Sequence, residues 1–193
     1  RDDLVTGVQT CALPIYPPVS TGDGVILGFQ AGCKLRDLEF MQFHPTTLHS
    51  GDKKPISIFL ITEALRGEGG ILRNMRGDAF MKRYHPDAEL APRSIVSRAI
   101  FSEMQKEKGN YVFLDLSNLK VDLKTRFPNI YRRCLSAGID ITRDFIPVAP
   151  AAHYFMGGIE TNIHGETAVA RLFAAGESSS LGLHGANRLA SNS

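Results

Sequence analysis

The sequence has no tryptophan, only three cysteines and almost no net charge. Cys11, Cys33 and Cys134 form neither a Cys-x-x-Cys pair nor a metal-ligand spacing, so we predict free thiols in a reducing cytoplasm and no metal site. A formal net charge of +2 is too small to indicate nucleic acid or an acidic surface as a partner. No apolar run reaches the roughly 18 residues of a membrane span, which predicts no membrane segment.

What is present is the composition of a globular protein, with 43% hydrophobic and 22% charged residues among 193. This length is enough for one domain with its own core, or for parts of two. Strand-like stretches alternate with helix-like stretches, so the predicted fold class is α/β or α+β. No Gly-x-Gly-x-x-Gly follows a first strand, so the usual cradle for a dinucleotide pyrophosphate is missing.

The first sixteen residues differ from the rest in having neither helical nor strand periodicity. They show no signal-peptide pattern, and the run VTGVQTCALPI at 5–15 resembles the translation of a sequencing-library adapter. A natural flexible leader is the alternative. We therefore expect 1–16 to be a non-native leader that takes no part in fold or function.

The remaining chain divides into short helical and extended patterns. We predict helices within the ranges 21–32, 91–109 and 123–138. We predict extended segments within 38–46, the start of 57–70, 111–119, 144–159 and the start of 170–193. Pro45 should end its strand, Gly109 should end the long helix, and Pro128 should break 123–138 into two helices. The run at 170–175 is expected to be a buried strand, and the end of the chain to open another helix.

Polar side chains gather in short glycine- and proline-rich segments that lie far apart in the sequence. They are His44, Thr62, Glu63, Arg66, Arg93, His153, His184 and Arg188. Such segments are typical of loops carried on a scaffold, and loops often carry binding sites. Arginine holds a planar carboxylate through two parallel hydrogen bonds, so two arginines with two or three histidines indicate an anion site.

Each of these residues also has a purely structural interpretation. A single loop histidine is more often a turn residue than a ligand. Glu63 and Arg66 are three residues apart and could be a surface ion pair that stabilises a helix by about 0.2–0.5 kcal/mol. Asn187 and Arg188 could simply begin a helix. Composition and spacing alone therefore lead no further than an anion-binding α/β enzyme of unidentified substrate.

Arg93 is the most unusual of the polar residues. Pro92 can open a helix because it lacks the N–H that a first turn leaves unpaired, and Ile95, Val96 and Ala99 give that helix an apolar face. Arg93 then lies in the first turn, where the helix dipole disfavours a cation. A dianionic ligand would favour a cation at this position.

Seven motifs follow one another along the chain: TGDG, EFMQFHPT, TEALRGEGG, ELAPRSIVSRAI, PAAHYFMGGI, AAGE and LHGANRLASNS. Taken in this order, they resemble the flavoprotein family of L-aspartate oxidase, fumarate reductase and the succinate dehydrogenase flavoprotein subunit. The resemblance extends from about Pro17 to Ser193 and is greatest to the L-aspartate oxidases. It implies a Rossmann-type FAD-binding domain, here 17–45 and 149–193, interrupted by an α+β capping domain, here 46–148.

The resemblance also implies roles for ten residues. The implied proton-transfer residues are Arg93 as general acid/base, with Glu63 and Arg66 as the path that leads to it. The implied ligands of the two substrate carboxylates are His44, Thr62, His153 and Arg188. The implied FAD contacts are Asp23, Glu177 and Ser193. A guanidinium normally stays protonated, so Arg93 can relay a proton only if a carboxylate takes one up, and Glu63 supplies it. Ser94 departs from the family, which usually has an acidic residue there, and would orient Arg93 less firmly.

The reaction implied by the resemblance is oxidation of the dicarboxylate L-aspartate to iminoaspartate, with FAD as hydride acceptor and oxygen or fumarate as reoxidant, in NAD biosynthesis. The alternatives are a fumarate reductase or succinate dehydrogenase flavoprotein, and a carboxylate-binding module without catalysis. The resemblance assigns no residue to a contact with quinolinate synthase. We expect the chain to be an internal part of a longer enzyme, because the amino-terminal half of the flavin domain is missing.

Overall fold

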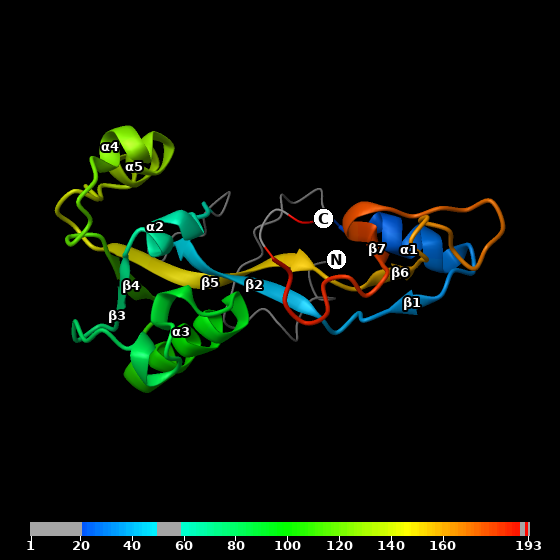
Figure 1. Ribbon diagram of the computed structural model, residues 1–193, viewed down its shortest axis with the longest axis horizontal. Helices are drawn as coiled ribbons and strands as arrows, with labels where there is room; N and C mark the ends of the chain where they lie inside the picture. Colours follow the sequence, from blue (N-terminus) through cyan, green and yellow to red (C-terminus); the bar gives the residue numbers. More distant parts are fainter. Residues whose placement is uncertain (1–20, 50–58, 190–191, 193) are drawn as a thin grey trace. The chain divides into compact units, whose positions relative to one another are not determined.

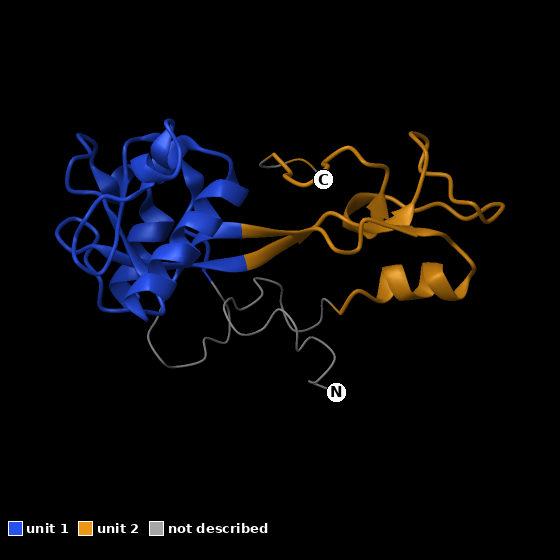
Figure 2. Cartoon of the chain, turned by 90° about the horizontal axis from the view of Figure 1, so that it is seen from below, with its two compact units in different colours: residues 1–15, 44–151 blue, residues 16–43, 152–193 orange. Residues whose placement is uncertain are grey.

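The computed structural model describes residues 21–49, 59–189 and 192 (Figure 1). Among these residues, His44–Ala151 forms one compact unit, unit 1, and the described parts of 16–43 and 152–193 form unit 2 (Figure 2). The chain passes between the units inside two strands, β2 (Met41–Leu48) and β5 (Ile146–Phe155). The assignment of these units to a capping and a flavin domain stays a prediction. The predicted leader and Ser193 lie outside the described residues.

The larger sheet has four strands in the order β2-β5-β4-β3. Strand β4 (Val112–Asp115) pairs antiparallel with both β5 and β3 (Ile71–Arg73), so that Leu114 lies opposite Ile146 on one side and opposite Leu72 on the other. All three of these side chains are fully buried. Strand β3 ends the sheet order, and one side of its backbone therefore needs partners other than a strand.

The hydrophobic core lies in unit 1, between this sheet and helix α3 (Arg93–Glu107), which packs against β4 (Figure 1). Val96, Ile100 and Met104 follow one another at four-residue intervals and form the buried face of the helix. Burial of each such side chain contributes about 1.5–3 kcal/mol relative to exposure. The helix thereby fixes Arg93, its first residue, against the body of unit 1.

Several predicted elements of this unit are confirmed. The long helix begins at Arg93 after Pro92 and ends at Glu107, with Lys108 in the left-handed conformation just before Gly109. Strand β4 lies within the predicted range 111–119. The helical range 123–138 is divided at Pro128 into α4 (Leu123–Arg126) and α5 (Pro128–Ser136), because proline lacks the donor that would continue α4.

Two predicted boundaries are wrong. Strand β2 does not stop at Pro45 but continues to Leu48. It is the outermost strand in the sheet order, a place where the missing N–H of a proline is tolerated. The run at 170–175 is not a buried strand, since it forms only an isolated bridge between Glu166 and Phe173, and Phe173 is 62% exposed. Among the described residues it has no further sheet neighbours to cover it. After the 3-10 turn Gly176–Ser178, no helix opens in the range 181–189, and residues 190, 191 and 193 lie outside the described residues.

Unit 2 contains the predicted helix α1 (Asp23–Gln30) and a three-stranded sheet in the order β1-β6-β7. The strands are β1 (Leu35–Arg36), β6 (Gly158–Glu160) and β7 (Ser179–Ser180). A Cβ atom at Gly28 would lie 2.4 Å from Cδ1 of Ile159. A larger residue at this position would force the Ile159 side chain to move, so glycine favours the close approach of α1 to β6.

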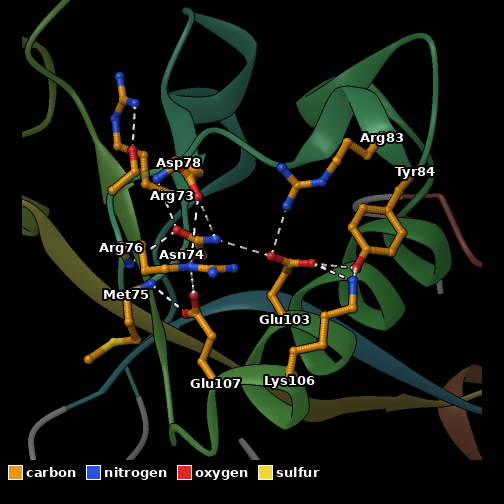
Figure 3. Close-up of polar contacts among 11 residues, drawn as sticks. Arg73, Asn74, Met75, Arg76, Asp78, Arg83, Tyr84, Glu103, Lys106 and Glu107 are labelled. Atoms are coloured by element: carbon orange, nitrogen blue, oxygen red, sulfur yellow. Dashed lines mark hydrogen bonds and ion pairs between the residues drawn. The ribbon is translucent and has the colours of Figure 1, made fainter.

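A polar network fastens the second half of α3 to the segment 74–84 (Figure 3). Its centre is the buried carboxylate of Glu103, which accepts hydrogen bonds from Tyr84 Oη at 2.6 Å, Lys106 Nζ at 2.8 Å, Arg83 Nη2 at 3.0 Å and Asn74 Nδ2 at 3.3 Å. Burial alone would raise the pKa of Glu103, but these hydrogen bonds outweigh it and lower the pKa from 4.5 to about 2. The carboxylate is therefore ionised at neutral pH.

Cys33 and Cys134 are both buried free thiols, and burial raises the pKa of Cys134 to about 11. Cys11 lies outside the described residues. None of the helices in the described part of the chain is long and apolar enough to cross a membrane.

Candidate active site

The central contact in unit 1 joins the first residues of two helices. Glu63 begins α2 (Glu63–Gly67), and Arg93 begins α3. Arg93 Nε donates to Glu63 Oε1 at 2.9 Å, and Arg93 Nη2 donates to Oε2 at 2.8 Å. This is the two-point pairing that a guanidinium makes with a carboxylate. Glu63 thereby offsets the cation that the α3 dipole disfavours.

Arg66 supplies a second guanidinium to the same carboxylate. Its Nη2 donates to Glu63 Oε1 at 2.8 Å, and its Nη1 donates to the main-chain carbonyl of Glu89 at 2.5 Å. The side chain of Arg66 is almost wholly buried, and its Nε has no hydrogen-bond partner among the described residues. Glu63 is thus held between two arginines, one on its own helix and one on α3. We call these three residues the Arg66–Glu63–Arg93 cluster.

Charge strongly favours the ionised form of Glu63. The hydrogen bond from Arg93 is the largest influence, and the charges of Arg93, Arg66 and His44 act in the same direction against partial burial. Together they lower the pKa of Glu63 from 4.5 to about 2. Burial lowers the pKa of Arg66, and Glu63 opposes that change. Glu63 can carry a proton between the two guanidiniums only after one of them has given it that proton.

Two further predicted residues of unit 1 lie around this cluster. Thr62 is the N-cap of α2, and its Oγ1 accepts a hydrogen bond from Ala64 N at 3.3 Å. The threonine therefore starts the helix that carries Glu63. His44 lies buried in β2, and its Nδ1 accepts from Thr46 N at 3.3 Å. Its influence on the pKa of Glu63 indicates that it lies near the cluster.

A second cluster lies in unit 2 around Arg188. The guanidinium of this buried arginine stacks over the ring of Tyr154, 4.0 Å from the ring centroid, and the ring of His184 meets Tyr154 edge-on at 5.5 Å. The Arg188 carbonyl accepts from Gln42 Nε2 at 2.6 Å, and Arg188 Nε donates to the Asn192 carbonyl. These contacts hold both the backbone and the side chain of Arg188 in place.

The other predicted site residues of unit 2 in the described part of the chain are Glu177, His153 and Asp23. Glu177 accepts a hydrogen bond from Phe155 N at 2.8 Å, and its burial raises its pKa while the nearby charge of Arg188 opposes the rise. His153 is a half-buried residue of β5. Asp23 is exposed at the start of α1 and accepts from Thr21 Oγ1 at 2.7 Å. Whether the residues of the two units face one cleft stays a prediction.

Reasoning from sequence missed three residues that support these clusters. Tyr154 stands beside the predicted His153, and an aromatic ring next to a polar loop is a weak signal for an arginine platform. Gln42 lies two positions before His44 and gave no signal of its own. Glu89 holds Arg66 through its main chain, so its residue type could not have revealed this contact.

Comparison with known families shows that residues 8–193 match the model of the FAD binding domain. The chain belongs to the FAD binding domain family. This membership confirms the predicted α/β class and indicates FAD as the cofactor of the family. The match begins inside the range 1–16, so the extent of the predicted leader stays a prediction.

Curated relatives in this family are L-aspartate oxidases. The chain is 53% identical to that of Synechocystis sp. over 192 residues, which cover 97% of this chain and 34% of the relative. It is 52% identical to that of Pseudomonas aeruginosa over 92% of this chain and 32% of the relative. The predicted resemblance is thereby confirmed. The chain spans about a third of the length of the curated relatives it matches.

Two solved structures that resemble this chain are a fumarate reductase and an Sdh1 protein. The quinol fumarate reductase FrdA of E. coli aligns with a TM-score of 0.80 and 41% identity, over 93% of this chain and 33% of that one. Mycobacterium smegmatis Sdh1 aligns with a TM-score of 0.66 and 41% identity, over 89% of this chain and 29% of that one. The likeness to the FAD binding domain family therefore extends from the sequence motifs to the fold.

A pocket in unit 2 fits part of a polar cofactor such as FAD. It has a volume of about 300 Å³ and is lined by residues in 161–165, 174–176 and 179–184. The hydroxyl of Thr161, in its wall, is buried and has no hydrogen-bond partner among the described residues. Gly176 and Gly182, both at positive φ, present main chain without a Cβ atom to the pocket. A bound cofactor could both pair the hydroxyl and lie close to this backbone.

Proposed function

We propose that the full-length protein containing this chain oxidises L-aspartate to iminoaspartate. The observation that carries the proposal is the Arg66–Glu63–Arg93 cluster, because its three charged groups are joined by direct hydrogen bonds and so can form a proton-transfer path. The L-aspartate oxidases among the relatives support the same choice of substrate. Oxygen or fumarate is the proposed reoxidant, and NAD biosynthesis is the proposed use of the product.

Arg93 is the proposed acid/base at the substrate carbon. Oxidation of an amino acid to an imine removes a proton as well as a hydride, and the proton needs an acceptor beside the substrate. Arg93 can serve as that acceptor only in concert with Glu63, because a guanidinium does not readily lose its proton alone. Glu63 is ionised at neutral pH and can take a proton up, and Arg66 on its other side can pass one onward.

The remaining predicted residues bind and orient the dicarboxylate. Arg188, held by Tyr154, is the proposed clamp for one carboxylate, since a guanidinium matches a carboxylate at two points. The other proposed substrate ligands are His44, Thr62 and His153. Holding the substrate in a reactive geometry is the largest contribution that such residues make, because it removes translational and rotational freedom before the reaction.

The FAD ligands that we propose in this chain are Glu177, Asp23 and Ser193, with the Thr161 pocket as part of the binding surface. When bound, FAD supplies the hydride acceptor. Glu177 already accepts a main-chain hydrogen bond from Phe155 and is partly buried, so it can act as a fixed acceptor for a cofactor hydroxyl. We place the enzyme in the cytoplasm, in keeping with the free thiols of Cys33 and Cys134.

A second candidate function is reduction of fumarate or oxidation of succinate. It is favoured by the likeness of the fold to the E. coli fumarate reductase, and the same cluster could serve it, because both reactions move a proton next to a carboxylate. The two functions differ at the substrate nitrogen, which L-aspartate has and succinate lacks. The cluster itself carries two cations, Arg66 and Arg93, and one anion, Glu63.

Steady-state turnover of the purified, FAD-containing full-length protein tests the proposal. We expect oxygen consumption and iminoaspartate formation with L-aspartate, and at least tenfold lower dye reduction with succinate. Succinate turnover that exceeds aspartate turnover would favour the second candidate. A protein that binds dicarboxylates but turns over neither L-aspartate nor succinate would instead be a binding module.

A further inference from the structure

On the side of β3 away from β4, the main chain pairs with the segment at Ala79 and Phe80 and also with one side chain. Leu72, in the middle of β3, is fully buried, and its N–H donates to Glu89 Oε1 at 2.9 Å. Without this acceptor, the buried N–H would be left unpaired, which is unfavourable. The carboxylate of Glu89 is therefore fixed to the edge of the sheet.

The main chain of the same residue holds a member of the cluster. The carbonyl oxygen of Glu89 accepts from Arg66 Nη1 at 2.5 Å, while Arg66 Nη2 reaches Glu63 at 2.8 Å. The guanidinium of Arg66 is planar, so fixing one of its nitrogen atoms fixes the direction of the other. The position of the Glu89 carbonyl thus decides how Arg66 meets Glu63.

The turn that presents this carbonyl is under backbone strain. Glu89 lies in a single 3-10 turn, Ala88–Leu90, and Ala88 has a φ of 48°, which is unfavourable for a residue with a Cβ atom. Such a conformation persists only where surrounding contacts enforce it. The hydrogen bond from Leu72 to the Glu89 side chain is one contact that can do so.

The charge of Glu89 acts on Arg66 as well. Burial lowers the pKa of Arg66 and the charge of Arg93 lowers it further, while Glu63 and Glu89 both raise it. These three groups, from α2, α3 and the 3-10 turn, are the charged neighbours of Arg66 that act on its titration. Glu89 is therefore the second carboxylate that keeps Arg66 protonated.

We propose that Glu89 is a positioning residue for the Arg66–Glu63–Arg93 cluster, because its side chain fastens the turn to β3 and its carbonyl then aims Arg66 at Glu63. This inference rests on the proposed function of the cluster in proton transfer. Glu89 does not contact Arg93 or a substrate in this account and acts only through Arg66.

The test compares three variants of the FAD-containing full-length enzyme. Glu89→Ala removes both the acceptor for Leu72 and the charge. Glu89→Gln keeps an acceptor oxygen and removes only the charge. Glu107→Ala is the matched control. Glu107 also accepts from a main-chain N–H, that of Met75 at 2.7 Å, and its side chain accepts from Arg76 Nε at 3.0 Å (Figure 3). Among the described residues, it forms no hydrogen bond or ion pair with the cluster.

We expect kcat for aspartate to fall about 10- to 100-fold in Glu89→Ala, with KM changed less than threefold, because a misplaced proton path slows chemistry more than binding. Glu89→Gln should recover most of kcat, because it keeps an acceptor for the Leu72 N–H. Glu107→Ala should keep kcat within about twofold.

Unchanged kcat in Glu89→Ala would overturn the inference, and so would equal losses of kcat in Glu89→Ala and Glu107→Ala. If the wild-type enzyme oxidises neither aspartate nor succinate, the proposed function fails independently. The crystal structure of Glu89→Ala then decides the positioning role. A shifted Arg66 guanidinium with a lengthened bond to Glu63 would support it, and an unmoved Arg66 would refute it.

Discussion

Glu63 and Arg93 are joined by two hydrogen bonds of 2.9 and 2.8 Å although 30 positions separate them in the sequence. Each residue begins a helix, so the pair ties the starts of α2 and α3 together. The pairing explains how an arginine is held in the first turn of α3, where the dipole disfavours it. It also fixes the plane of the guanidinium, and with it the direction in which Arg93 would exchange a proton in the proposed reaction.

Arg93→Lys should lower aspartate turnover about 10²–10⁴-fold while weakening dicarboxylate binding only slightly. Lysine keeps the charge but loses the planar fork that contacts both Glu63 oxygens. Turnover kinetics and titration with an unreactive dicarboxylate measure the two effects separately. Arg98→Lys, an exposed change on the same helix, is the control and should leave both unchanged. Near-normal turnover in Arg93→Lys would remove Arg93 from the chemistry.

Arg188→Lys should raise the dissociation constant for an unreactive dicarboxylate and KM for aspartate by at least tenfold. The proposed clamp acts in the ground state and in the transition state alike, so its loss weakens binding throughout the reaction. The lysine would also lose the stacking on Tyr154 that now holds the guanidinium. Arg171→Lys, at an exposed position of unit 2, is the control. Dicarboxylate affinity that matches the control would exclude Arg188 from the clamp.

Glu103→Ala should destabilise the protein at neutral pH by about 2 kcal/mol, because a buried carboxylate with four hydrogen bonds is lost. For a domain of 150–250 residues this lowers Tm by roughly 4–8 °C. Lys106→Ala should lower Tm much less than Glu103→Ala, since Lys106 is exposed and its pair is screened by water.

The difference between Glu103→Ala and the wild type should depend on pH. The folded-state pKa of Glu103, about 2, lies below its ordinary value of 4.5, so its contribution is complete above about pH 4.5 and is lost as the pH falls toward 2. Thermal unfolding at pH 7, 5, 4 and 3 measures this trend. A Tm difference that stays constant down to pH 3 would contradict the account of the network.

Local sequence patterns predicted the elements that depend on local chemistry. Pro128 divides a helical range because it lacks a donor, and Pro92 precedes a helix because its N–H is not needed there. Pro45 was misjudged because its effect depends on the position of β2 at the edge of the sheet, which is a property of the tertiary fold. The same holds for 170–175, where burial depends on neighbours far away in the sequence.

The candidate site also contains some residues that sequence motifs reveal and others that only the tertiary fold reveals. Glu63 and Arg93 could be proposed from motifs, and the structure adds that they contact each other directly. Glu89 could not be found in this way, since it acts through a main-chain carbonyl and through the N–H of Leu72, 17 positions away. A contact made through a backbone atom does not require a particular residue type, so a single sequence cannot reveal it.

Reduction of the flavin under anaerobic conditions tests the central claim most directly. Oxidised full-length enzyme is mixed rapidly with L-aspartate or with succinate, and the flavin absorbance is followed before any reoxidant is present. The account predicts that aspartate bleaches the flavin in the wild type, that succinate does so at least tenfold more slowly, and that Arg93→Lys slows the aspartate reaction about 10²-fold or more. Rapid bleaching by succinate but not by aspartate, or equal rates in the wild type and Arg93→Lys, would contradict it.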